Sequence, residues 1–93
     1  MKTKIPFYPQ LAIRAWSEPD EHGVSYELYT KCGFKVTPID NTTIGTHPFR
    51  GIVRSLWDPH EQVYEHWTAD GYYFGWTAPM HMDLQLFKIT NDD

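Results

Sequence analysis

Five histidines and one cysteine are the residues of this 93-residue chain whose types are best suited to metal binding or nucleophilic chemistry. They are far apart in the sequence and form none of the short spacings, such as C-x-x-C or H-E-x-x-H, that place two ligands on one element. Nothing in the sequence places an activating group beside the single thiol. We therefore expect no metal site, no cofactor and no catalytic residue among His22, Cys32, His47, His60, His66 and His81.

Arg50 and Arg54 are candidates for binding an anion. They belong to "PFRGIVRSLW" (48–57), where alternation predicts a central strand with both guanidinium groups on one face, about 13 Å apart. Arginines beside aromatic rings can hold an anionic, nucleotide-like ligand, because bases stack on aromatic faces. The alternative is that both arginines are solvent-facing residues that discourage edge pairing.

Aromatic residues, 16% of the chain, are concentrated in "YEHWTADGYYFGW" (64–76). The Asp70-Gly71 pair predicts a turn between strands at 62–68 and 72–76, with Trp67 and Phe74 in the core. Tyrosine and tryptophan left outside the core would suit a protein interface, although aromatic pairs also stabilise a hairpin without any partner. The interface hypothesis names four anchors: Tyr64, Tyr72, Tyr73 and Trp76.

Short alternating segments separated by turn residues must position these side chains. Further strands are expected at 24–30, 34–39 and 83–89, with a strand or single helical turn at 11–16. Gly51, inside the central strand, indicates a bulge or a close backbone approach. The pattern predicts one all-β domain over 1–93, with residues 1–10 as an extended arm and 90–93 as a solvated tail. Its fold would be a small SH3-like barrel or a strongly bent antiparallel sheet of about six strands, with little helix.

Composition narrows the classes of partner. Twelve acidic and eight basic residues give a formal charge of −4, which argues against general nucleic-acid binding. No segment approaches the roughly 18 apolar residues of a membrane helix. A single cysteine forms no disulfide within the chain, and no segment resembles a signal peptide, so we expect a cytoplasmic protein.

Two segments follow a common plan. "YELYTKCGFKV" (26–36) and "YEHWTADGYYF" (64–74) both read Tyr, Glu, any residue, aromatic, Thr, two residues, Gly, aromatic. Either a duplicated hairpin or convergence on the same turn chemistry explains this, and the sequence leaves both open.

A series of motifs resembles a group of small phage and prophage proteins. They are a T-x-x-G hairpin, a His/Tyr-Pro strand, a "[YW]-T-x-D-G-x-Y" hairpin and a terminal Asp-Leu strand, over residues 26–87. The matching positions are Thr30, Gly33, His47, Pro48, Trp67, Thr68, Asp70, Gly71, Tyr73, Asp83 and Leu84. Cys32 departs from the group, which tends to have Asp before the first turn glycine. The resemblance implies a phage-encoded β protein that acts in a bacterial cytoplasm, and it brings no catalytic residues.

Three functions are compatible with these features. The first is a non-enzymatic binding module that engages a host or phage protein through an exposed aromatic face. The second is an oligomeric sponge that sequesters an anionic, nucleotide-like signalling molecule and so counters bacterial defence. The third is a small enzyme that uses scattered histidine and aspartate residues.

Overall fold

The fold is a six-stranded antiparallel sheet, seen in a computed structural model that describes residues 1–41, 45–54, 60–73 and 82–90. The spatial order of the strands is β1-β6-β2-β3-β4-β5, so the last strand of the chain lies between the first two. One four-residue helix, α1 (Pro9–Ala12), follows β1. The strands are β1 (Lys2–Ile5), β2 (Ser25–Thr30), β3 (Lys35–Asn41), β4 (Phe49–Arg54), β5 (Gln62–Trp67) and β6 (Leu84–Ile89).

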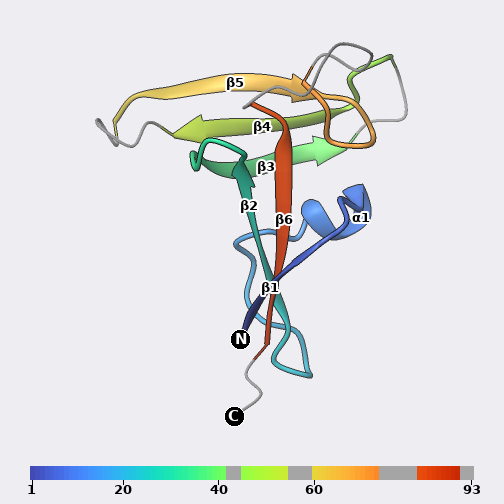
Figure 1. The fold of residues 1–93 in the computed structure, drawn as a ribbon, viewed down its shortest axis with the longest axis vertical. Helices are drawn as coiled ribbons and strands as arrows, with labels where there is room; N and C mark the ends of the chain where they lie inside the picture. Colours follow the sequence, from blue (N-terminus) through green and yellow to red (C-terminus); the bar gives the residue numbers. More distant parts are fainter. Residues whose placement is uncertain (42–44, 55–59, 74–81, 91–93) are drawn as a thin grey trace.

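The sheet bends sharply between β2 and β3. These strands share a single register pair, Tyr29 opposite Lys35, whereas β2 and β6 are paired along six residues. In Figure 1, β3, β4 and β5 accordingly cross the upper part of the view, while β1, β2 and β6 are close to vertical and extend into its lower part. The expected all-β fold, with a strongly bent sheet and little helix, is confirmed.

Trp16 stabilises this bend. Its backbone N–H donates to the Tyr26 carbonyl at 2.9 Å, and its indole N–H donates to the Val36 carbonyl at 2.8 Å. Trp16 therefore bridges β2 and β3 where their own pairing has ended. Its φ of 66° is in the left-handed region, which is unusual for a bulky residue and shows that the surrounding contacts impose this conformation.

The core occupies the inner face of the bend. Alternation places every second residue there: in β2 Tyr26, Leu28 and Thr30 are buried, and in β6 Leu84 and Leu86. The helix α1 contacts β2 and β3 and contributes Ala12 to this core. Trp67, predicted as a core residue, is fully buried, whereas Phe74 is outside the described residues.

Gly51 marks a close approach between β4 and β3. A Cβ atom at this position would lie 2.9 Å from Val36 Cγ1 and 3.2 Å from the Thr37 carbonyl oxygen. Glycine at this position therefore allows the two strands to pack at this distance. The bulge is in the partner strand, where the β3–β4 register shifts between Pro38 and Asp40.

Two turns of the same design follow β2 and β5. In the first, Gly33 N–H donates to the Thr30 carbonyl, Thr30 N–H to the Phe34 carbonyl, and Phe34 N–H to Thr30 Oγ1. Thr68, Gly71 and Tyr72 make the same three hydrogen bonds in the second turn. Gly33 and Gly71 both have positive φ, at 97° and 86°. The sequence similarity of the two segments therefore extends to their hydrogen bonding.

Two expectations about element boundaries need correction. Residues 1–10, expected as an arm, supply β1, which pairs with β6, and the start of α1. Tyr72 and Tyr73, expected to begin a strand, are not in one: Tyr73 N–H donates to Asp83 Oδ1 and its carbonyl contacts His47 Nε2. These side chains occupy the groups that a strand ladder would need. Residues 74–76 of the expected strand and 91–93 of the tail lie outside the described residues.

Candidate functional site

The outer face of β4 and β5 brings together residues that the sequence suggested for two different roles. The strands pair with Ile52 opposite Tyr64 and Arg50 opposite His66. Directly opposed residues of antiparallel strands point to the same face, and Ile52 lies midway between Arg50 and Arg54 in β4. The Tyr64 ring is therefore flanked diagonally by both arginines, at Cα distances of about 7–8 Å.

An ion pair orients one of these arginines. Arg50 Nε donates to Asp40 Oδ1 at 2.8 Å, and its terminal nitrogen also contacts Asp40 Oδ2. Hydrogen bonding to Arg50 lowers the pKa of Asp40, and the same hydrogen bond raises the pKa of Arg50. Both remain charged at neutral pH. Asp40 engages one edge of the guanidinium and leaves the other edge available to a ligand.

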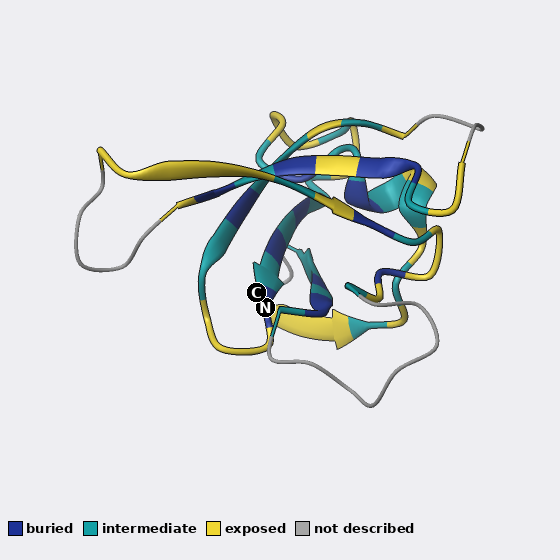
Figure 2. Ribbon diagram, turned by 90° about the horizontal axis from the view of Figure 1, so that it is seen from above, coloured by how far each residue is buried: buried dark blue, intermediate teal, exposed yellow. Residues whose placement is uncertain are grey.

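Arg54 and Tyr64 provide accessible surface on this face. Arg54 is exposed and forms no ion pair with any residue that the structure describes. Tyr64 is 70% exposed, and its side chain makes no hydrogen bond within the described part of the chain. The first half of β5, Gln62 to Tyr64, is exposed and is coloured yellow in Figure 2. The face thus combines accessible cationic groups with an accessible aromatic ring.

The three anchors that the structure describes, Tyr64, Tyr72 and Tyr73, lie in different environments. Tyr64 is on β5, whereas Tyr72 follows the second turn and is 48% exposed. Tyr73 is half-buried and packs on Trp67, with ring centroids 6.4 Å apart, and its hydroxyl donates to Glu65 Oε2 at 2.8 Å. This hydrogen bond raises the pKa of Tyr73. Trp76 lies outside the described residues.

The histidine and cysteine side chains are dispersed. Among the described residues, no group of three His, Cys, Asp or Glu side chains is arranged to hold a metal ion. Both ring nitrogens of His47 make hydrogen bonds: because the Tyr73 carbonyl only accepts, His47 Nε2 donates to it, and Nδ1 accepts from Thr46 Oγ1. His22, His60 and His66 are exposed, as is Cys32, and His81 is outside the described residues.

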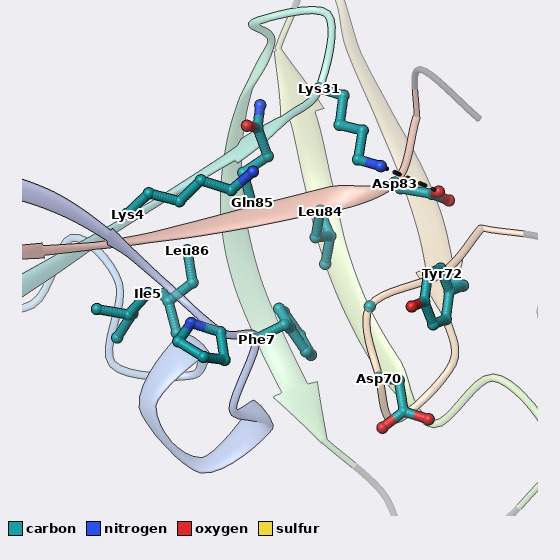
Figure 3. Close-up of a pocket in the computed structure, with 12 residues that line it drawn as sticks. Lys4, Ile5, Phe7, Lys31, Asp70, Tyr72, Asp83, Leu84, Gln85 and Leu86 are labelled. Atoms are coloured by element: carbon teal, nitrogen blue, oxygen red, sulfur yellow. Dashed lines mark ion pairs between the residues drawn. The ribbon is translucent and has the colours of Figure 1, made fainter. Parts of the chain in front are cut away.

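A pocket of about 310 Å³ lies beside the second turn, which contributes Asp70, Gly71 and Tyr72 to its lining (Figure 3). It forms where β1 leaves β6 after Ile5, because Pro6 has no N–H with which to continue the pairing. Its floor is apolar, and charged side chains surround it. The lining consists of Lys4, Ile5, Pro6, Phe7, Lys31, Asp70, Gly71, Tyr72, Asp83, Leu84, Gln85 and Leu86.

Sequence reasoning missed Ile52 and His66 on the outer face, and Lys4 and Asp83 in the pocket. The first two follow from the alternation of β4 and β5 once the strand register is known. The pocket residues come from β1, two turns and β6, and no local signal predicts that these segments meet.

The α1 helix spans four residues, and no helix of the described segments is both long and apolar enough to cross a membrane. Comparison of the chain with protein-family models, curated proteins and solved structures finds no match.

Proposed function

We propose that this protein is a non-enzymatic binding protein that holds an anionic, ring-bearing small molecule, such as a nucleotide, on the outer face of β4 and β5. The observation that carries the proposal is the position of Tyr64 between Arg50 and Arg54. Guanidinium groups bind phosphate in a fork geometry, and an exposed tyrosine ring offers a stacking surface for a base.

The shape of this face supports an oligomer. Small-molecule sites normally enclose about 70–90% of the ligand surface, whereas the face of a sheet covers only one side of a ligand. A second copy of the chain would cover the other side and add its own charges. This arrangement corresponds to a sponge that sequesters a signalling molecule. From the motif resemblance we propose that the protein is phage- or prophage-encoded and counters defence signalling in the bacterial cytoplasm.

A thermal-shift and calorimetric screen against mono- and dinucleotides tests the proposal. At least one nucleotide should raise the melting temperature, and Arg54→Gln should weaken its binding about tenfold or more, because charge-assisted hydrogen bonds are worth about 1.5–3 kcal/mol. Tyr64→Ala should weaken it by a similar factor, whereas Tyr64→Phe, which keeps the ring, should bind nearly as well. Glu18→Gln, an exposed charge change in another loop, is the control.

Two results would overturn this proposal. One is the absence of binding by every nucleotide in the screen. The other is nucleotide binding that Arg54→Gln and Tyr64→Ala leave unchanged. Light scattering with and without the bound nucleotide tests the oligomer separately, since a complex that remains monomeric contradicts the covered site.

A protein partner is the second candidate, and one observation favours it. Adjacent residues Val63 and Tyr64 are 47% and 70% exposed in β5, an edge strand of the described sheet. Exposed edges can add an extended segment of another protein as a further strand. Affinity capture from bacterial lysate should recover a partner that Tyr64→Ala loses and that Tyr72→Ala, at an exposed tyrosine elsewhere, retains. Recovery of the bait alone contradicts this candidate.

A further inference from the structure

The pocket beside the second turn is separate from the outer face of β4 and β5, and its charges are arranged in a specific way. Lys31 Nζ lies 4.0 Å from Asp83 Oδ2, so these two charges are paired within the protein. Lys4 and Asp70 also line the pocket, but neither side chain makes a hydrogen bond or ion pair with any residue that the structure describes. The pocket thus has one accessible positive group and one accessible negative group.

These two groups are on opposite sides of the pocket. In Figure 3 the side chains of Lys4 and Gln85 lie on one side of the β6 ribbon, while Asp70 and Tyr72 lie on the other. Leu84 and Phe7 lie between them and form the apolar floor. A ligand that spans the pocket therefore meets a cation at one end, apolar surface in the middle and an anion at the other end.

The backbone around the pocket is fixed. Leu84 N–H donates to the Gly71 carbonyl at 2.9 Å, which joins the second turn to β6. A Cβ on Gly71 would lie 2.8 Å from Phe7 Cγ, so the turn packs directly on the Phe7 ring. Phe7 in turn contacts Phe49, with ring centroids 5.3 Å apart. These contacts hold the walls in place before any ligand binds, which lowers the entropic cost of binding.

We propose that this pocket binds a small zwitterionic molecule with an apolar centre, of the size and chemistry of a short free peptide. Its carboxylate binds Lys4, with Gln85 beside it, and its ammonium group binds Asp70 and the face of Tyr72. A cation over a tyrosine ring is attracted by the ring quadrupole. The volume of about 310 Å³ is near the lower limit of about 300–1,000 Å³ for small-molecule sites.

Isothermal calorimetry with the tripeptide Gly-Leu-Gly, its N-acetyl form and its C-terminal amide tests the proposal. The free tripeptide should bind, and each capped form should bind about fivefold more weakly, as expected for loss of one solvent-accessible ion pair. In Lys4→Gln the free and amide forms should bind equally. In Asp70→Asn the free and N-acetyl forms should bind equally.

Matched controls separate this pocket from the nucleotide site. Arg54→Gln removes a positive charge from the outer face and should leave tripeptide binding unchanged. Glu18→Gln removes a negative charge from a loop outside the pocket and should also leave tripeptide binding unchanged. Lys4→Gln should leave nucleotide binding unchanged. Unaltered melting temperatures establish that the variants are folded. Failure of the free tripeptide to bind, or equal binding of all three forms to the unmodified protein, overturns the proposal.

Discussion

Asp83 accepts a hydrogen bond from the backbone N–H of Lys31 through its carbonyl oxygen, at 2.9 Å. Its carboxylate accepts another from Tyr73 N–H at 2.8 Å. Asp83, a buried residue immediately before β6, therefore connects Lys31 within the first T-x-x-G turn to Tyr73 just after the second. These turns are 38 residues apart (30 to 68), and Asp83 explains why they lie together.

Replacement of Asp83 by Ala should destabilise the protein by about 1–3 kcal/mol, because Tyr73 N–H loses its carboxylate acceptor. Urea unfolding followed by tryptophan fluorescence measures the loss. Asp70→Ala is the matched control: its carboxylate is exposed, so the change should stay within about 0.5 kcal/mol. Equal effects of the two substitutions would contradict the role of Asp83.

The two turn glycines offer a second comparison. Gly33→Ala should cost about 1–2 kcal/mol, because alanine is strained at positive φ although no other atom lies within 4 Å of the added Cβ. Gly71→Ala incurs the same strain and also a clash with the Phe7 ring. Its free energy of unfolding should therefore fall by about 1–3 kcal/mol more. Equal losses in chemical denaturation would show that Phe7 does not restrict this turn.

Trp16→Phe should lower stability by about 1–3 kcal/mol, since the Val36 carbonyl loses the indole N–H at a fully buried residue. Tyr29→Phe is the control, because it keeps the ring that contacts Trp16 and removes only the hydroxyl that donates to the half-buried Glu27 carboxylate. Thermal unfolding should show the larger decrease for Trp16→Phe. A smaller effect than that of Tyr29→Phe would contradict the proposed bridge between β2 and β3.

Acid should weaken the fold partly through Asp40. Its pKa is lower in the folded protein than in the unfolded chain, because Arg50 binds the charged carboxylate. This contribution to stability is present above the unfolded pKa, about 3.9, and is lost as the pH falls through the lower pKa of the folded state. Unfolding measured from neutral pH to below pH ~3 should show a shallower decline for Asp40→Asn. An unchanged slope would show that the ion pair does not contribute.

Alternation made the central strands and their faces predictable from sequence. Arg50 and Arg54 face outward and Trp67 faces inward, as the period of two requires. The turn glycines were equally clear, since Gly33 and Gly71 both adopt positive φ. These features depend on residues that are near one another in the chain.

The remaining features depend on distant partners. Pairing of β1 with β6 joins the two ends of the described chain, and the strain at Trp16 arises from contacts with β2 and β3. The position of Tyr64 beside the arginines required the β4–β5 register. No local pattern specifies such relationships, which explains why the sequence suggested the arginines and Tyr64 separately.

The position of β6 has a consequence for how the protein forms during translation. β6 leaves the ribosome after the other five described strands, yet β1 and β2 both pair with it. Until it emerges, β1 has no partner among the other strands that the structure describes, and Leu28 of β2 lacks its neighbour Leu86. Contacts between residues so far apart in sequence slow folding. We therefore expect nascent chains stalled before residue 84 to remain protease-sensitive, and protection to appear in a single step once β6 is available.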